Sequence, residues 1–236
     1  MKILLIIPAY NEEENILNTI NNIKQCSNEI EYVVVNDGST DNTLKILQEN
    51  NINHINLVHN LGIGGAVQSG YKYAYANNYD IAIQFDGDGQ HDANFIQTIC
   101  EPVIANQADI CIGSRYLDKT TSEFKSTIMR RFGKNIISAM IKLFWHKKIT
   151  DPTSGFRAAN KTVIEIFAKD YPSDYPEPES IVTLLRSGLK VVEKPVNMKE
   201  RKGGKSFVSP GTSIIYMLKV SLAIVLDSIR VKDRRK

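Results

Sequence analysis

Cysteine and tryptophan are scarce in this chain of 236 residues, which contains three cysteines and one tryptophan. Cys26, Cys100 and Cys111 are odd in number and scattered, and their spacing matches neither a metal site nor a disulfide framework. We therefore interpret them as small core residues of a protein that works in a reducing, cytoplasmic compartment.

Long uninterrupted apolar runs are also missing. The apolar start at residues 1–7 stops at Pro8 and no small-residue cleavage site follows it, so we interpret it as a first strand and not as a signal peptide. Residues 214–226 form an apolar stretch of 13 residues that contains Lys219. A helix of this length spans roughly 20 Å, less than the roughly 30 Å of a bilayer's hydrocarbon core. Neither segment is expected to cross a membrane.

Three common ligand-binding motifs are absent as well. The sequence has no Gly-Lys-Ser/Thr phosphate loop, and Gly62-Ile-Gly64-Gly65 lacks the last glycine of the dinucleotide fingerprint. No acid available for a ribose follows at the usual distance, so a nicotinamide enzyme is a weak rival. No glutamate follows Asp86-Gly-Asp88-Gly at the spacing of an EF-hand, which disfavours a calcium loop.

Positive charge is unevenly distributed, although the net charge of the chain is only +3. Residues 115–148 contain nine lysines and arginines against two acids, and residues 230–236 contain five basic residues and one acid. Such patches suit phosphate-rich partners, which include nucleotides and an anionic membrane surface. No recognition motif for nucleic acid accompanies them, so we expect no nucleic acid partner.

Four strand-like runs, at residues 2–8, 30–35, 52–58 and 81–85, alternate with helix-like segments. This alternation predicts an α/β fold with a mostly parallel, twisted sheet flanked by helices. A polar motif follows each run. Because the carboxyl ends of parallel strands meet at one edge of a sheet, where such folds bind ligands, we expect the functional site there.

The polar motif after the fourth run is Asp86-Gly-Asp88-Gly. Residues i and i+2 of a strand point to the same side, so the two carboxylates are able to converge. Two hard oxygen ligands suit Mg²⁺ or Mn²⁺, since such ions take one or two protein carboxylates together with phosphate oxygens. The glycines let a bulky diphosphate approach the backbone. The same residues would also suit an ordinary turn.

Two helices of mixed character are expected in the second half of the chain. Residues 126–145 predict a basic amphipathic helix with an apolar residue at every fourth position: Ile128, Phe132, Ile136, Met140 and Phe144. Residues 213–229 predict a C-terminal amphipathic helix that packs on its own domain, docks on a bilayer surface or mediates a homodimer. Strands are expected at residues 108–113 and 189–196.

Seven motifs follow one another along the chain. They are Pro8-Ala-Tyr-Asn-Glu12, Val35-Asn-Asp37-Gly-Ser-Thr-Asp41, Asn60-Leu-Gly-Ile-Gly-Gly, Asp86-Gly-Asp88-Gly-Gln-His, Gly113-Ser-Arg115-Tyr, Asp151-Pro-Thr-Ser-Gly-Phe-Arg157 and Glu200-Arg-x-x-Gly-Lys205-Ser. In this order they resemble family 2 glycosyltransferases of the GT-A (Rossmann-like) fold, in the branch that contains polyprenyl-phosphate (dolichol-phosphate-mannose-type) synthases. The resemblance implies an inverting, metal-dependent transfer of a sugar from a nucleoside-diphosphate sugar, with UDP or GDP as the nucleotide.

The resemblance also implies roles for individual residues. Those expected to bind the nucleotide are Pro8, Ala9, Tyr10, Glu12, Asp37, Gly62 and Asp86. Asp86 and Asp88 match the metal–diphosphate motif, with Asp88 as the more direct, catalytic ligand. Those expected on the acceptor side are Arg115 and Arg131, which match phosphate-binding arginines, and the acid Glu179. Arg201 and Lys205 match catalytic cations of a loop that closes over the donor diphosphate.

The sequence does not identify the acceptor substrate. The segment Tyr-Pro-Glu-Pro before Glu179, and Asn135, depart from the pattern of the lipid-phosphate enzymes. The acceptor is therefore expected to be a polyprenyl phosphate or a glycan. A phosphate needs no strong base, whereas a sugar hydroxyl needs Glu179 or Glu177 to take its proton. A nucleotide-sugar-binding protein without turnover is a further alternative.

The chain is expected to divide into a catalytic domain and a C-terminal extension. Residues 1–208 form the predicted catalytic domain. Residues 209–236 form the predicted apolar helix and basic tail, which would dock on the cytoplasmic face of a membrane or on a second copy of the chain.

Overall fold

A seven-stranded sheet organises the computed structural model, which describes residues 1–26, 30–118, 128–199, 219–222 and 224–225. Its strands lie in the order β3-β2-β1-β4-β6-β5-β7. They are β1 Ile3–Ala9, β2 Glu31–Asn36, β3 His54–Asn56, β4 Ile81–Gln84, β5 Ile110–Ser114, β6 Arg157–Asn160 and β7 Val191–Pro195. β6 pairs antiparallel with β4 and β5, and the other pairs in this sheet are parallel. The predicted α/β fold with a mostly parallel sheet is confirmed.

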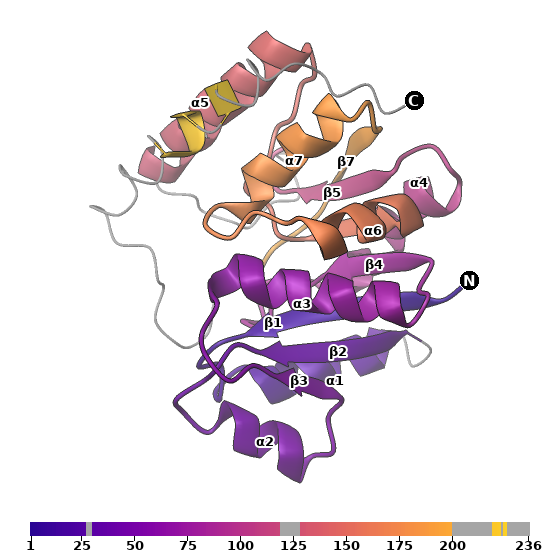
Figure 1. Cartoon of the computed structure of the whole chain (residues 1–236), viewed down its shortest axis with the longest axis vertical. Coiled ribbons are helices and arrows are strands. Elements are labelled where there is room, and N and C mark those ends of the chain that lie inside the picture. The colour runs from indigo at the N-terminus through magenta and orange to yellow at the C-terminus, as the bar shows by residue number, and fades with distance from the viewer. Residues whose placement is uncertain (27–29, 119–127, 200–218, 223, 226–236) are drawn as a thin grey trace.

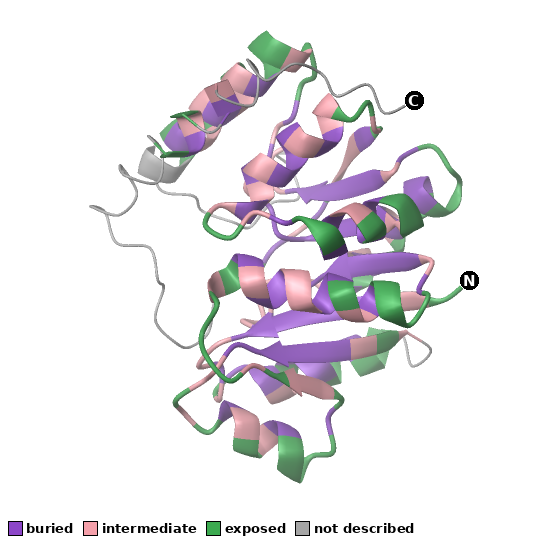
Figure 2. Ribbon diagram, in the orientation of Figure 1, coloured by how far each residue is buried: buried purple, intermediate pink, exposed green. Residues whose placement is uncertain are grey.

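Helices cover both faces of this sheet (Figure 1). They are α1 Ile16–Cys26, α2 Thr43–Glu49, α3 Gly62–Ala76, the 3₁₀ turn Ala93–Phe95, α4 Ile96–Ile104, α5 Ile128–Trp145, α6 Lys161–Lys169 and α7 Pro176–Arg186. Successive side chains of a strand point to opposite faces. Leu4 and Ile6 therefore pack in a core with α3, α5, α6 and α7, whereas Leu5 and Ile7 pack in a second core with α1 and α4. Figure 2 shows the resulting burial of the central strands.

Several element boundaries differ from the predicted ones. α1 begins at Ile16 and is preceded by a turn, in which Asn11 adopts a φ of 54° and the Glu12 carbonyl accepts the Ile16 N–H at 2.9 Å. β3 is shorter than predicted. α7 begins at Pro176, since the fixed φ of proline suits the first turn of a helix.

The helix α5 confirms the predicted element, but only part of the predicted apolar stripe faces the core, where Met140 packs. Ile137 and Ile141 are fully buried, whereas Phe132 is 66% exposed and Phe144 is 40% exposed. A step of four residues overshoots a helical turn of 3.6 residues by about 40°. Five residues spaced four apart consequently wind around the helix, and they cannot all lie on one buried face.

The C-terminal segment packs, where it is described, on the same core as α5. Val220 and Ile224 are fully buried in that core, and Leu222 is exposed. The remainder of the predicted helix at residues 213–229 lies outside the described residues. Within the described part of the chain, no helix has the length and apolar character that crossing a membrane requires.

Candidate active site

The turns after β1 and β2 are tied together by hydrogen bonds at the carboxyl edge of the sheet. The Asn11 N–H donates to Ser39 Oγ at 3.0 Å, and the Thr40 N–H donates to Asn11 Oδ1 at 2.8 Å. The Glu12 N–H donates to Thr43 Oγ1 at 2.9 Å. These bonds hold the two turns side by side, so that both contribute to one wall.

Asp37 connects that wall to the loop after β3. Its side chain is buried, and Oδ1 accepts the Leu61 N–H at 2.7 Å. Burial raises the pKa of Asp37, and hydrogen bonds from the N–H groups of Leu61 and Gly62 oppose the rise. Gly38 has a φ of 64°, and a Cβ there would lie 2.8 Å from the Asn60 nitrogen. Only glycine fits between the two loops.

Asp86 and Asp88 follow β4, beside the end of β1. The order β3-β2-β1-β4 makes this the point where an open α/β sheet binds its ligand. Asp88 Oδ1 accepts the Gln90 N–H at 3.0 Å, and Gln84 Nε2 donates to Asp86 Oδ1 at 3.4 Å. Gly155 packs against the carboxylate of Asp86, because a Cβ there would lie 2.9 Å from Oδ2.

The charge state of Asp86 reflects opposed influences. Partial burial raises its pKa, while the Gln84 amide and the positive charges of Arg115 and Arg157 oppose the rise. The neighbouring ring of His91 is buried, which lowers the pKa of that histidine to about 4 and keeps the ring neutral. Asp86 is therefore surrounded by neutral donors and more distant cations.

A cavity of about 480 Å³ opens at this edge of the sheet. It is lined by every residue predicted to bind the nucleotide or the metal: Pro8, Ala9, Tyr10, Glu12, Asp37, Gly62, Asp86 and Asp88. Its acids are Glu12, Asp37, Asp86, Asp88 and Asp174, and no lysine or arginine of the described residues lines it. We call it the acidic cavity.

Two residues of the acidic cavity, Ser173 and Asp174, are missed by sequence reasoning. They belong to the turn between α6 and α7, far along the chain from the other lining residues. This turn packs on the first turn of α3 at Gly64, where a Cβ would lie 2.2 Å from the Pro172 carbonyl oxygen. A glycine at that position signals a close backbone approach, but it does not identify the partner segment.

A second cavity, of about 720 Å³, lies between α5 and the segments that follow β5 and α5. Its cations are Arg115, Arg131, Lys134, Lys142 and Lys148, and no acid of the described residues lines it. The structure thus brings both predicted acceptor-binding arginines into one cavity and adds three lysines that the sequence had not assigned. We call it the basic cavity.

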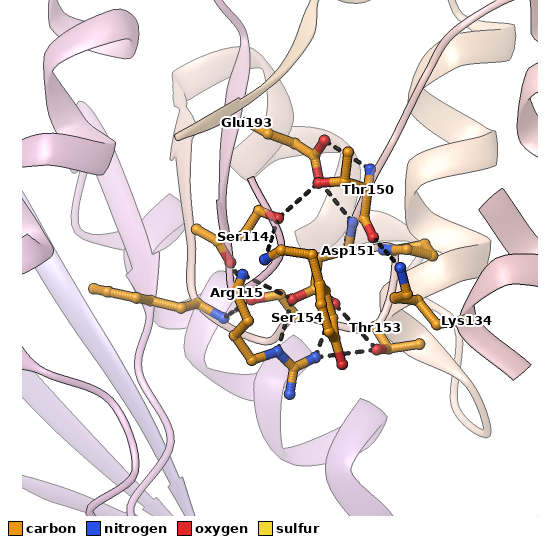
Figure 3. A network of polar contacts seen from close by, with 12 residues as sticks. Ser114, Arg115, Lys134, Thr150, Asp151, Thr153, Ser154 and Glu193 are labelled. Carbon is orange, nitrogen blue, oxygen red and sulfur yellow. Dashed lines mark hydrogen bonds and ion pairs between the residues drawn. The ribbon is translucent and has the colours of Figure 1, made fainter. Parts of the chain in front are cut away.

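Arg115 is held in place by a network of polar contacts (Figure 3). Its Nε and Nη2 donate to the two carboxylate oxygens of Asp151 at 2.7 and 2.8 Å. Glu193 of β7 accepts the N–H groups of Thr150 and Asp151 at 2.7 and 2.8 Å, and Lys134 Nζ donates to the Thr150 carbonyl at 3.1 Å. The bidentate pair between Arg115 and Asp151 fixes the plane of the guanidinium. Arg115 is therefore a preset cation whose charge is shared with Asp151.

The two glutamates of α7 have different surroundings. Burial raises the pKa of Glu177, the charge of Arg157 opposes the rise, and the charge of Asp86 adds to it. Glu177 is thus electrostatically coupled to the acidic cavity. Glu179 lines a separate cavity of about 170 Å³ between α6 and α7. The structure does not bring Glu179 together with the other predicted site residues.

Arg201 and Lys205 lie outside the described residues. The chain shortly before them is paired with the loop that carries Asp88. The Lys199 N–H donates to the Gln90 carbonyl at 2.8 Å, and His91 forms an isolated β-bridge with Met198.

Asp86 and Asp88 fit the requirements of a Mg²⁺ or Mn²⁺ ion. No group of three or more His, Cys, Asp or Glu side chains able to hold a metal occurs in the described ranges. Mg²⁺ is usually held by one or two carboxylates and completes its octahedron with water and substrate phosphates. Two carboxylates that face an open cavity match this pattern and not an all-protein cage.

Comparison with known proteins agrees with the geometry. The model of the glycosyl transferase family 2 matches residues 4–167. The chain is 35% identical over 214 residues to the UDP-N-acetylglucosamine–dolichyl-phosphate N-acetylglucosaminyltransferase of Methanococcus voltae, with 82% of this chain and 84% of the relative covered. It is 26% identical over 230 residues to the polyprenol monophosphomannose synthase of Mycolicibacterium smegmatis, with 92% and 85% covered.

A solved structure shares the fold. The crystal structure of glucosyl-3-phosphoglycerate synthase from Mycobacterium tuberculosis, in complex with Mn²⁺, UDP and glucosyl-3-phosphoglycerate, superposes with a TM-score of 0.68 at 16% identity. The match covers 99% of this chain and 81% of that chain. The predicted GT-A fold is confirmed. The family model and the relative with 35% identity show that the chain belongs to glycosyl transferase family 2 and is a glycosyltransferase.

Proposed function

We propose that this glycosyltransferase moves a sugar from a nucleoside-diphosphate sugar to a polyprenyl phosphate, with Mg²⁺ or Mn²⁺ bound at the donor. The observation that carries the proposal is the pairing of an acidic cavity with a basic cavity at one edge of the sheet. Arg115 lines the basic cavity and Asp86 lines the acidic cavity, and the charges of these two residues influence each other. Transfer between two phosphate-bearing substrates needs two neighbouring sites of this kind.

The acidic cavity suits the donor only in the presence of a cation. A nucleoside diphosphate is an anion, and five carboxylates repel it unless positive charge intervenes. Asp88 and Asp86 would hold the metal, which when bound neutralises the charge that develops on the leaving diphosphate. Arg201 and Lys205 would add further charge, since they follow the segment paired with Gln90. The presence of Mn²⁺ and UDP in the Mycobacterium tuberculosis structure supports this assignment.

The basic cavity suits an acceptor that is already an anion. Five cations line it, and Arg115 is preset by Asp151, so a phosphate there would be oriented as it binds. A phosphate oxygen attacks without losing a proton, which removes the need for a strong general base. The names of the two relatives, a dolichyl-phosphate and a polyprenol monophosphate enzyme, support a lipid phosphate.

The surface next to the basic cavity favours action at the cytoplasmic face of a membrane. Phe132, Leu143 and Phe144 of α5 are exposed on the helix that supplies Arg131 and Lys142. Exposed apolar side chains give adhesion to a bilayer, and lysines and arginines add attraction to anionic lipid. The proposed C-terminal extension, residues 209–236, contains further basic residues that would suit the same kind of lipid.

A second candidate acceptor is a sugar hydroxyl, and the position of Glu177 favours it. A hydroxyl acceptor needs a base near the donor, and burial and Asp86 both raise the pKa of Glu177. The basic cavity would then have no assigned ligand, so we rank this acceptor second.

One experiment distinguishes a lipid-phosphate acceptor from a sugar hydroxyl acceptor, and both from a binding protein without turnover. Purified protein is incubated with UDP- or GDP-sugars and with a polyprenyl phosphate, the matching polyprenyl alcohol or an oligosaccharide, with Mn²⁺ or with EDTA, and the products are identified by mass spectrometry. We expect a polyprenyl-phosphate sugar that forms with Mn²⁺ only. Transfer to the oligosaccharide alone would favour the second candidate, and nucleotide binding without any transfer would contradict both.

A further inference from the structure

His91 lies beneath the acidic cavity and does not line it. Its side chain is 0% exposed. The ring stacks on Phe156, with centroids 4.9 Å apart and an angle of 20°, and forms a T-shaped pair with Phe85, with centroids 5.2 Å apart. These rings fix the plane of the imidazole, so that its two nitrogens have set directions.

Both nitrogens of His91 are directed at Asp86. Nδ1 accepts the backbone N–H of Asp86 at 3.0 Å, so Nδ1 carries no proton and the ring hydrogen lies on Nε2. Nε2 is 3.5 Å from Asp86 Oδ2, which is longer than a normal hydrogen bond. Within the described part of the protein Nε2 has no other partner. Leaving a buried donor without a hydrogen-bond partner is unfavourable, and a small rotation of the carboxylate would bring Oδ2 within hydrogen-bond distance of Nε2.

The other side of the Asp86 carboxylate has a matching contact. Gln84 Nε2 lies 3.4 Å from Oδ1, and Gly155 leaves no room behind the group. The two donors next to the carboxylate are therefore an amide and a neutral imidazole. Such donors orient a carboxylate without neutralising it, whereas a lysine or arginine in direct contact would compete with a metal for its charge.

We propose that His91 is a positioning residue that orients the carboxylate of Asp86 for the divalent cation. The inference rests on the proposed function, because it assumes that Asp86 binds the metal. A rotation of the Asp86 carboxylate that shortens the 3.5 Å gap between Oδ2 and Nε2 would give it a hydrogen bond from the Nε2–H of His91, which would hold its oxygens in one orientation for a cation. His91 touches neither substrate nor metal in this role.

Three variants separate this role from a structural one. His91→Asn retains an acceptor near the position of Nδ1 and removes the donor at Nε2, whereas His91→Phe retains the stacking and removes both. His146→Asn, at an exposed histidine of the α5 end, is the control. Mn²⁺ binding is measured by calorimetry with UDP present, and the thermal midpoint is measured without metal.

We expect His91→Asn to weaken Mn²⁺ binding about 10- to 100-fold, the range found for residues that support a metal ligand. His91→Phe should weaken Mn²⁺ binding at least as much, and the control should match the wild type. Equal Mn²⁺ affinity in the wild type and His91→Asn, with only a lower thermal midpoint, would overturn the proposal and leave the proposed function intact. Absence of Mn²⁺ binding in the wild type would overturn both.

A measurement on the wild type remains decisive if the variants fail to fold. In a protein labelled with ¹⁵N-histidine, the Nε2–H signal of His91 is expected to move downfield when Mg²⁺ and UDP are added, as its hydrogen bond shortens. An unchanged Nε2–H signal, in a sample that binds Mg²⁺, would contradict the proposal.

Discussion

At the scale of single residues, Asp88 and Asp86 have different surroundings. Asp86 is surrounded by Gln84, His91 and Gly155, whereas Asp88 accepts the Gln90 N–H of its own loop. The expectation that Asp88 makes the more direct contact with the metal rests on the family resemblance and stays a prediction.

Asp88→Asn should abolish transfer while the fold survives. The amide keeps the size of the side chain and loses the negative charge that the cation needs. We expect kcat to fall at least about 100-fold, with a thermal midpoint near that of the wild type. The control is Asp80→Asn, at the opposite end of β4, where the carboxylate accepts the Lys2 N–H. Wild-type turnover in the Asp88 variant, with metal added or chelated, would contradict the metal role.

Glu177→Gln and Glu179→Gln test whether a base is needed. With a polyprenyl phosphate as acceptor, both should change kcat by less than about 10-fold, because a general base is typically worth 10²–10⁴-fold and a phosphate requires none. Rates are compared at saturating donor and metal. A loss of 100-fold or more confined to Glu177→Gln would show that a proton is removed during transfer, and the acceptor would then be a hydroxyl.

At the scale of the elements, the sequence predicts those helices and strands whose own residues carry the pattern of that structure. β1 and β4 are continuous apolar runs that end in polar motifs, so their type and the position of the acidic cavity follow from the sequence. The strand β6 has the residues Arg-Ala-Ala-Asn, which carry no strand signal, and it forms because β4 and β5 supply partners on both sides.

Some residues of the candidate site are likewise predictable from the sequence, and others are not. Asp37, Asp86 and Asp88 are predictable because each follows a strand. Ser173 and Asp174 are not, since the packing of their turn on Gly64 is a tertiary contact. The same holds for the electrostatic influence of Asp86 on Glu177, which depends on where α7 begins.

Glu193→Gln should weaken acceptor binding without affecting the donor. On β7, Glu193 accepts two backbone N–H groups of the segment that fixes Arg115, and an amide would turn an NH₂ toward one of them. We expect a loss of about 1–3 kcal/mol in stability and a higher KM for the acceptor phosphate. UDP affinity, measured by calorimetry, should be unchanged. A parallel loss of UDP affinity would mean that the change beside the basic cavity also impairs nucleotide binding in the acidic cavity.

At the scale of the whole molecule, the proposal that the enzyme docks on a membrane rests on the exposed apolar residues of α5. Phe132→Ser with Phe144→Ser should reduce flotation with anionic liposomes, because burying one such side chain contributes about 1.5–3 kcal/mol. Wild-type binding should weaken as salt rises. Val58→Ser, at an exposed residue remote from α5, is the control. If the wild type stays with the soluble fraction on anionic liposomes at low salt, membrane docking by this face is contradicted.

The antiparallel strand β6 has a kinetic consequence. It separates β4, which ends before Asp86, from β5, which ends before Arg115, and adjacent strands lie about 4.8 Å apart. The two ends are thus held about 10 Å apart by one intervening strand, which leaves room for a single sugar ring between two phosphates. Under the proposed function, both substrates would then be present together, and the sugar would pass directly from one to the other. Initial rates measured over a grid of donor and acceptor concentrations should give intersecting double-reciprocal lines, whereas parallel lines would require a sugar-bound enzyme that this spacing does not accommodate.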